Sequence, residues 1–449
     1  MLSTCKKAAI SPAVSLVLAL SAQLTLGSAA AEEAKMPKSE PVGNHLEQVR
    51  EILRQVPLVD GHNDVPWQYR QRVSNHLDQI DLAGDTTSLD PPMHTDIPRL
   101  RKGGVGGQFW SVFVPADLPG PEAARATFEQ IDLVHRLVRR YPQDLELALT
   151  AADVRRIHAQ GRVASLIGME GGHSIANSLG VLRQLYAVGA RYMTLTHSEN
   201  VDWADSSTDA PEVGGLSPFG REVVREMNRL GMLVDLSHVS PAVMHQALDV
   251  TQAPVIFSHS SAFALTAHPR NVPDDVLKRL PENGGVVMVT FVPAFVSEPV
   301  RQYWAAYQAE EKRFEALYPG APDKAKAALE AWREANPSPM ATLSDVADHV
   351  DHLVKEAGVD HVGIGSDFDG IRFTPEGLGG ADAYPDLLAE LLRRGYSAED
   401  AGKIAGGNVL RVFEQAEEVA ARLRQETGPS DALIEELDHV APAAPSSAD

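Results

Sequence analysis

Six short apolar runs in this chain end on side chains that can bind a metal ion. The residues at these ends are His62 with Asp64, Glu170, His197, His238, His259 and Asp367. Runs that stay apolar on both faces are typical of buried parallel strands. In parallel α/β folds the carboxyl ends of the strands share one rim, where active sites are built. One such ending often marks only the exit of a strand to solvent, but six together predict a metal site at that rim.

Strand and helix signals alternate along the chain. Strands are expected at residues 57–64, 106–114, 163–170, 192–197, 232–238, 255–259, 284–291 and 361–367. Helices are expected at about 121–140 and over 218–230, where Ser217 and Pro218 are a start signal and Gly231 is a stop. Eight strands with intervening helices predict an α/β fold, a (β/α)8 TIM-type barrel.

Two stretches depart from this repeat. Residues 301–337 are charged and have a helical pattern, which predicts a helical segment inserted after the seventh strand, of unassigned role. Residues 78–98 are rich in Asp, Thr and Pro, which predicts a long loop after the first strand. Both stretches follow the carboxyl end of a strand, so we expect them on the catalytic rim, where lids are often built.

The ends of the chain differ from the part between them. Lys6 and Lys7, an apolar stretch at 13–26 and the small residues up to Ala31 are typical of a signal peptide that is cleaved after Ala31. The predicted boundaries are 1–31 for the signal peptide, 32–46 for a linker, 47–427 for the catalytic domain and 428–449 for a C-terminal tail. The tail lacks the hydrophobic end of a lipid-anchor signal. We therefore expect an exported protein, periplasmic or secreted, without a membrane anchor.

Cysteine content and charge narrow the chemistry further. The only cysteine, Cys5, lies within the predicted signal peptide, so a metal in the mature chain must be held by His, Asp and Glu. The formal charge is 40 − 61 = −21, which argues against nucleic acid and anionic membranes as partners.

The candidate ligands suit a pair of ions. His62 and Asp64 are two residues apart on an extended segment, so both can point to one ion. His238 and His259 end consecutive strands, whose ends lie about 4.8 Å apart in a sheet. Glu170 between these pairs would bridge the ions. Zinc suits such nitrogen and oxygen ligands best, although Mn or Co could also bind.

Two further residues have more than one interpretation. A bridging hydroxide between the ions would need a proton carrier, and Asp367 fits that role. Alternatively, Asp367 and Asp369 only shape the turn at 366–370, where Asp and Gly are favoured. His197 either donates a hydrogen bond to the developing oxyanion or is a buried structural histidine.

Eight segments resemble the membrane (renal-type) dipeptidases, a family of zinc metallopeptidases of the amidohydrolase type. The matching segments are residues 62–67, 168–174, 195–200, 215–220, 234–240, 254–262, 270–275 and 363–370. They occur in the same order as in the family and extend over most of the chain. The resemblance implies a (β/α)8 hydrolase with two zinc ions and a homodimer.

The resemblance also implies residue roles. By motif match, His62 and Asp64 bind the first ion, Glu170 bridges, and His238 and His259 bind the second ion. His197 and Arg270 resemble the substrate contacts and Asp367 the acid/base. Arg270 is singled out by the resemblance alone, and its guanidinium would suit the carboxylate of a substrate.

Some features differ from the animal members of the family. The chain has no anchor signal and no cysteine after the predicted cleavage point, so it resembles a bacterial exported relative. Phe295 falls where the animal enzymes have a tyrosine in the substrate pocket, so side-chain preference does not carry over.

Three functions are compatible with the sequence. The first is a zinc-dependent dipeptidase for L,L-dipeptides and, as the family implies, L,D-dipeptides. The second is another amidohydrolase-type reaction on the same ions, such as deacylation of an N-acyl amino acid or lactam opening. The third is a binding protein on an inactive barrel, which predicts a lost ligand or proton carrier. All of these candidate residues are present, which favours an enzyme.

Overall fold

The protein is represented by a computed structural model that describes residues 42–439. The predicted signal peptide, most of the predicted linker and residues 440–449 of the predicted tail lie outside the described residues. None of the helices between residues 42 and 439 is both long and apolar enough to cross a membrane.

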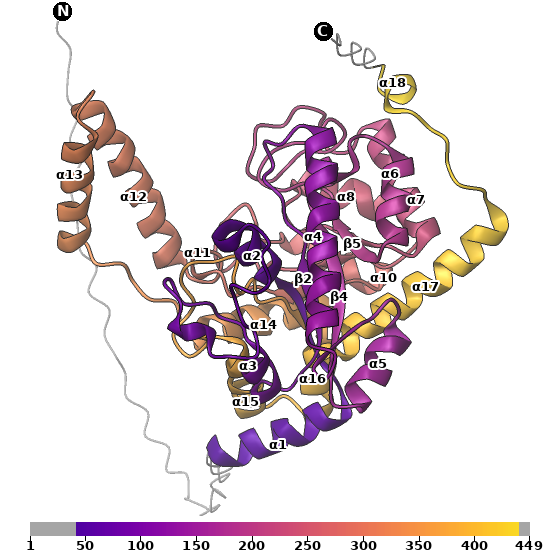
Figure 1. Ribbon diagram of the computed structural model, residues 1–449, viewed down its shortest axis with the longest axis horizontal. Coiled ribbons are helices and arrows are strands. Elements are labelled where there is room, and N and C mark those ends of the chain that lie inside the picture. The colour runs from indigo at the N-terminus through magenta and orange to yellow at the C-terminus, as the bar shows by residue number, and fades with distance from the viewer. Residues whose placement is uncertain (1–41, 440–449) are drawn as a thin grey trace, which may run out of the picture. The chain divides into compact units, whose positions relative to one another are not determined.

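Eight parallel strands form a closed barrel, as the sequence predicts. Figure 1 shows strands in the middle of the folded part with helices around them. The strands are β1 (Leu58–Asn63), β2 (Val105–Ser111), β4 (Val163–Glu170), β5 (Ala190–Thr194), β6 (Leu233–Asp235), β7 (Ile256–Phe257), β8 (Val286–Val289) and β9 (Val362–Ile364). Their order is β2-β1-β9-β8-β7-β6-β5-β4, and pairing of β2 with β4 closes the ring. All residues of β1, β2 and β4 are buried, which explains why these runs are apolar on both faces.

A ninth strand, β3 (Leu145–Leu147), was not expected. It pairs with the first residues of β4, from Val163 to Ser165, before β5 takes over as the neighbour of β4. With only three residues it carries too little pattern to be predicted.

Helices cover the outside of the barrel. The expected helices are present as α4 (Gly120–Arg140) and α7 (Pro218–Leu230). The Ser217 side chain accepts a hydrogen bond from the Gly220 amide at the start of α7, and Gly231 ends the helix with a φ of 86°. The other helices of at least nine residues around the barrel are α1 (Val42–Gln55), α2 (Val65–Val73), α5 (Ala151–Ala159), α6 (Leu179–Ala187), α8 (Pro241–Val250), α14 (Leu343–Ala357), α15 (Tyr384–Arg393) and α17 (Asn408–Glu426).

Helix α1 begins at Val42, within the stretch that the sequence analysis assigns to a linker. Val49, Ile52 and Leu53 recur at helical spacing and are buried, and α1 packs on α15. Leu46 belongs to the same apolar face and is partly buried against the core. The polar residues around this face conceal the start of the helix in the sequence.

Part of the predicted C-terminal tail is bound to the barrel. Residues 428–439 include the short helix α18 (Ile434–Leu437), whose Ile434 is buried. The Asp438 carboxylate accepts hydrogen bonds from the Ser217 hydroxyl at 2.5 Å and from the Phe219 amide at 2.9 Å. These bonds fix the segment to the first turn of α7.

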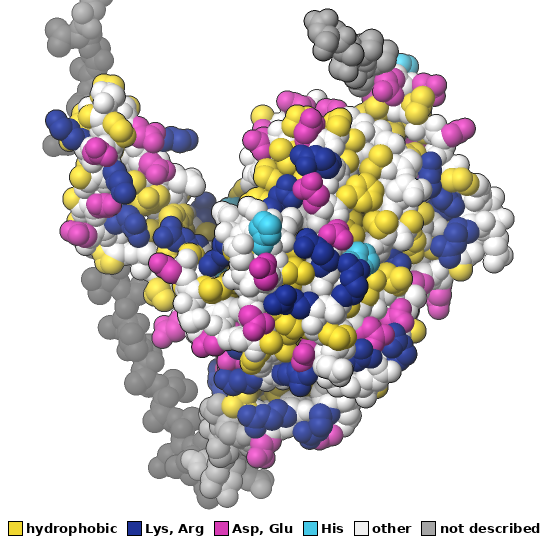
Figure 2. Space-filling view, in the orientation of Figure 1, with side chains coloured by type: hydrophobic (Ala, Val, Ile, Leu, Met, Phe, Trp, Pro, Cys, Tyr) yellow, Lys and Arg dark blue, Asp and Glu magenta, His cyan; other side chains and the backbone are white. Residues whose placement is uncertain are grey.

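The predicted helical insertion is confirmed as two helices, α12 (Glu298–Leu317) and α13 (Pro322–Ala335), which pack on each other. Tyr307 contacts Trp304 and Trp332 with ring centroids 5.2 and 6.3 Å apart. Figure 2 shows hydrophobic side chains among charged ones on these helices, and Leu317 is 56% exposed. The pair therefore holds together through its own aromatic contacts.

Candidate metal centre

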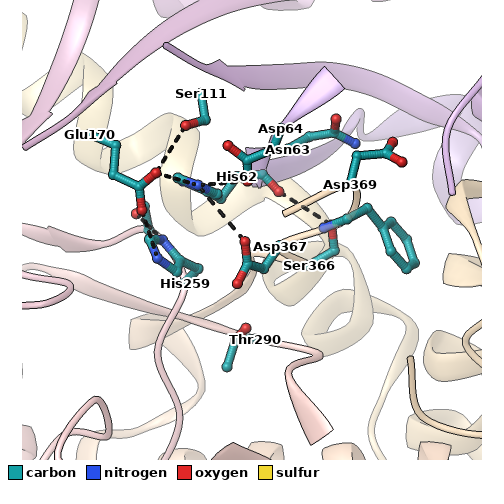
Figure 3. Close-up of polar contacts among 12 residues, drawn as sticks. His62, Asn63, Asp64, Ser111, Glu170, His259, Thr290, Ser366, Asp367 and Asp369 are labelled. Carbon is teal, nitrogen blue, oxygen red and sulfur yellow. Dashed lines mark hydrogen bonds and ion pairs between the residues drawn. The ribbon is translucent and has the colours of Figure 1, made fainter. Parts of the chain in front are cut away.

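The predicted ligands meet around Glu170 at the carboxyl end of the barrel. Figure 3 shows His62, Asp64, Glu170 and His259 among them. The Glu170 Oε2 atom lies 3.4 Å from His62 Nε2. The Oε1 atom lies 3.0 Å from His238 Nε2 and 3.4 Å from His259 Nε2. The two carboxylate oxygens thus face different histidines, which is the arrangement of a bridging ligand.

The first pair of ligands follows from β1. His62 is fully buried in the strand, and Asp64 follows directly after it. The His62 Nε2 atom lies 3.3 Å from Asp64 Oδ2 and 4.0 Å from Asp367 Oδ1. Three side chains from β1 and the loop after β9 therefore converge on one point (Figure 3).

The residues present fit a metal. His62 Nε2 is buried and has no hydrogen-bond partner among the described residues, although it faces two carboxylates. An unpaired buried polar atom costs about 1–3 kcal/mol, which a bound cation would offset. Imidazole nitrogens and carboxylate oxygens without thiolates are a donor set that zinc accepts.

Seven side chains form overlapping groups in which the candidate ligand atoms lie within 4.8 Å of one another. The groups are His62, Glu170 and His259; Glu170, His197 and His238; and His62, Asp64 and Asp367. His197 and Asp367 thus lie as close to the centre as the predicted ligands. The predicted division into five ligands and two other functional residues remains a prediction.

Charge at the centre is set by the histidines around Glu170. Burial alone would raise the pKa of the Glu170 carboxyl, but the neighbouring histidines hold that pKa well below its usual range. The Ser111 hydroxyl also donates a hydrogen bond to Glu170 Oε2 at 3.2 Å. Glu170 is therefore an anion, as a bridging ligand must be.

Asp367 has the opposite electrostatic character. Burial raises the pKa of its carboxyl well above the usual range, the nearby Asp64 and Glu170 raise it further, and His62 opposes the shift. The residue has a left-handed backbone with a φ of 65°, and its amide donates to the His62 carbonyl at 3.1 Å. A Cβ at Gly370 would overlap the carboxylate oxygens of Asp64 and Asp367, so a larger residue there would displace these two side chains. This carboxyl can hold a proton beside the candidate ligands.

His197 follows β5 and borders the centre. Its Nε2 atom lies 3.8 Å from Glu170 Oε1, and its ring packs between those of Phe113 and His238, at 4.7 and 4.3 Å. Burial lowers the pKa of His197, and the charge of Arg270 adds to that effect. A neutral imidazole at this position can donate one hydrogen bond to a substrate.

Arg270 is a buried cation beside the candidate ligands, 3% exposed. Its guanidinium donates to the His259 carbonyl at 3.2 Å and to the Ser260 hydroxyl at 3.4 Å, and lies 5.5 Å from the centroid of the Phe295 ring. Burial lowers the pKa of Arg270 to about 10, so it stays charged at neutral pH. Among residues 42–439 the guanidinium donates to this hydroxyl and this carbonyl and not to a carboxylate, so the cation can accept an external anion.

The loop predicted at 78–98 reaches the same rim. The His94 amide donates to Asp369 Oδ1 at 2.7 Å, and the Asp369 amide donates to His94 Nδ1 at 3.0 Å. Burial raises the pKa of Asp369 to about 6. Asp369 therefore anchors the loop in addition to shaping the turn at 366–370.

Sequence reasoning missed a set of polar residues behind the ligands. Tyr192 contacts His62, Ser258 contacts His259, and Asp235 accepts a hydrogen bond from Ser258. Ser258 could have been noticed because it directly precedes His259. Tyr192 carried no signal, because a tyrosine inside an apolar strand is usually part of the core.

Comparisons with known proteins agree with this geometry. The profile of a family described as Membrane dipeptidase (Peptidase family M19) matches residues 46–427. Dipeptidase verJ of Clonostachys rogersoniana is 42% identical over 396 residues, which is 86% of this chain and 90% of that protein.

Two solved structures are similar in fold. The probable dipeptidase PvdM from Pseudomonas aeruginosa is 26% identical with a TM-score of 0.72, over 84% of this chain and 100% of that chain. A metallo peptidase from Rhodobacter sphaeroides, liganded with a phosphinate mimic of the dipeptide L-Ala-D-Ala, is 25% identical with a TM-score of 0.67, over 80% of this chain and 99% of that chain. The chain thus belongs to the membrane dipeptidase family M19 and is a metallopeptidase, a hydrolase that acts on peptide bonds.

Proposed function

We propose that the protein hydrolyses the single peptide bond of L,L- and L,D-dipeptides. The observation that carries the proposal is the position of Arg270, a buried guanidinium without a carboxylate partner among the described residues, next to a cluster of histidines around Glu170. A short substrate with a free carboxylate can reach both the cation and the cluster at once.

In this proposal the cluster binds two zinc ions. His62 and Asp64 would hold the first ion, His238 and His259 would hold the second, and Glu170 would be shared by both. When bound, the ions make a water molecule acidic enough to attack the substrate at neutral pH.

The remaining residues bind the substrate and carry the proton. Arg270 pairs with the terminal carboxylate of the dipeptide through its planar fork of donors. His197 donates a hydrogen bond to the carbonyl oxygen as negative charge develops there. Asp367 takes a proton at its carboxylate and passes it to the leaving amine, and its raised pKa suits this exchange.

The proposal that the protein also hydrolyses dipeptides with a C-terminal D-residue is supported by one relative. The Rhodobacter sphaeroides enzyme has been solved with a mimic of L-Ala-D-Ala. In this chain Phe295 presents an apolar ring 5.5 Å from the Arg270 guanidinium, so it borders the side chain of the C-terminal residue in our proposal. An apolar ring at this position should accept small aliphatic side chains of L- or D-residues better than charged side chains.

A kinetic panel tests the proposal. Zinc-reconstituted enzyme is assayed with L-Ala-L-Ala, L-Ala-D-Ala, an N-acyl amino acid and a lactam. We expect both dipeptides to be hydrolysed with the highest kcat/KM. Faster turnover of the N-acyl amino acid or the lactam would replace the dipeptidase assignment with another amidohydrolase-type reaction on the same cluster.

We also propose that the protein is exported and forms a homodimer. Export is supported by the signal-like residues 1–31, which lie outside the described residues. The dimer is supported only by the resemblance to the family, and sedimentation of the purified protein would test it.

A further inference from the structure

We propose that Tyr192 and the Ser258–Asp235 pair are positioning residues that each act on a different one of the two ions. The inference rests on the proposed binuclear site and goes beyond it, because it assigns roles to residues that touch neither ion nor substrate. A histidine ligand needs its outer nitrogen held by a partner, which fixes both the tautomer and the orientation of the ring.

Tyr192 supports His62 from inside the barrel. Its ring is fully buried, and the absence of a side chain at Gly168 makes room for it, because a Cβ there would overlap the tyrosine ring. The hydroxyl lies 2.8 Å from His62 Nδ1 and donates its only proton to the Gly61 carbonyl at 3.2 Å. In our proposal the hydroxyl oxygen accepts from Nδ1–H, which is the tautomer that leaves the Nε2 lone pair free for the first ion.

Ser258 and Asp235 support His259 in a different way. The Ser258 hydroxyl lies 2.8 Å from His259 Nδ1 and donates to Asp235 Oδ2 at 2.6 Å, so it accepts from Nδ1–H. Asp235 is fully buried and is contacted only by donors. The remaining donors are the Thr194 hydroxyl and the amides of Ser237 and Ser258, at 2.5, 3.0 and 2.9 Å. A carboxylate thus stands behind this histidine, whereas a phenol stands behind His62.

His238, the third histidine ligand, has no such support. Its Nδ1 atom is buried without a hydrogen-bond partner among the described residues. A left-handed backbone with a φ of 68° and the ring of His197, 4.3 Å away, define its orientation instead. Because His238 and His259 share the second ion, the Ser258–Asp235 pair provides the only outer hydrogen bond to a histidine of that site among these residues.

Tyr192 and the Ser258–Asp235 pair should therefore affect the affinities of different ions. Outer partners of ligating histidines typically contribute 10–100-fold to metal affinity. Tyr192→Phe keeps the ring and removes only the hydroxyl, so it should weaken the first ion by roughly 10–100-fold and leave the second within about twofold. Ser258→Ala should do the reverse.

Chelator competition on the full chain, with zinc alone as the probe, tests the inference. Wild-type protein should release two ions in separate steps, and Asp64→Ala, which removes a ligand of the first site only, identifies the first step. The matched control is Tyr69→Phe, which removes another buried tyrosine hydroxyl, one that donates to the Ile80 carbonyl, and should shift neither step by more than about twofold. Ser258→Thr, which retains a hydroxyl, should restore the affinity lost in Ser258→Ala.

The outcomes separate the inference from the proposed function. The inference would be overturned if Tyr192→Phe and Ser258→Ala shifted the same release step, or if neither changed either zinc affinity by more than about twofold. Wild-type protein would still bind two ions in these cases. Wild-type protein that binds fewer than two ions would instead overturn the binuclear site itself. If Tyr192→Phe does not fold, the comparison of Ser258→Ala with Ser258→Thr still tests the inference. Weaker zinc binding at the first step in Ser258→Ala, or no change at either step, would contradict the assignment of Ser258 to the second ion.

Discussion

The Asp367 side chain is 16% exposed and sits on a left-handed backbone between candidate ligands and solvent. Three roles fit this position: proton carrier, metal ligand and turn residue. Asp367→Asn should keep both ions and lose turnover by the roughly 10²–10⁴-fold typical of general acid–base groups, because an amide cannot exchange the proton. Zinc content and kcat are measured together on the same preparation.

Each of the other roles predicts a different result for this variant. A metal ligand would lose zinc along with activity. A turn residue would lose neither, because Asn is as well tolerated as Asp in such turns. Zinc-replete protein with near-normal kcat would therefore rule out the proton-carrier role.

Arg270 is tested by the substrate that it recognises. Arg270→Ala should lower kcat/KM for dipeptides by roughly 10–100-fold, because a charge-assisted hydrogen bond contributes about 1.5–3 kcal/mol. A dipeptide with an amidated C-terminus has no carboxylate to lose and should change by less than about threefold. Arg372→Ala, at an exposed arginine in the loop after β9, is the matched control. Equal losses on both substrates would contradict carboxylate binding by Arg270.

At the scale of the elements, the sequence predicted what depends on burial. The barrel strands are enclosed on both faces, so their apolar runs stand out in the sequence. The candidate ligands could be predicted as well, because they lie at the carboxyl ends of these runs. Elements fixed by few residues were missed. The strand β3 is too short for a pattern, and the start of α1 depends on the packing of Leu46 and Val49 against the core.

The polar support of the site was less predictable than the ligands. Tyr192 and Asp235 lie in strands and look like core or strand-end residues until the neighbouring strands are placed. Their partners are 130 and 23 residues away in sequence, so no local spacing reveals them. Arg270 likewise required a family resemblance, since nothing in its local sequence indicates burial.

Asp369 connects the loop at 78–98 to the rim and makes stability depend on pH. Its folded pKa, about 6, lies above the usual value of 3.8 because the carboxyl is buried. The folded state therefore binds more protons than the unfolded state between pH 4 and 6, and this contribution to stability is lost as pH rises through that window. The loss is at most about 3 kcal/mol.

Asp369→Asn should remove this dependence, because the amide oxygen still accepts from His94 but does not titrate. The free energy of unfolding in urea is compared for both proteins at low and near-neutral pH. The variant should gain stability relative to wild type as pH rises. An unchanged difference between the two proteins across the window would mean that Asp369 titrates normally.

At the scale of the whole molecule, the candidate metal centre is built from side chains on or directly after β1, β4, β6, β7 and β9. Bound ions should therefore stabilise the entire barrel. Elemental analysis should give two ions per chain, because the candidate ligands exceed the four that one zinc accepts. Removal of the ions by a chelator should lower Tm, since His62 Nε2 and Glu170 then lose their buried partners. Full activity with one ion or none would contradict the binuclear site.

The final prediction concerns where the folded unit begins. The first described helix of the folded unit starts at Val42, after the predicted cleavage point at Ala31. Protein without residues 1–31 should therefore fold, bind zinc and hydrolyse dipeptides like exported protein, whose N-terminus should lie near Glu32. N-terminal sequencing of exported protein and Tm of both forms provide the measurements. Exported protein that begins at Met1 would refute cleavage, whereas a truncated form with a lower Tm would show that residues 1–31 contribute to the fold.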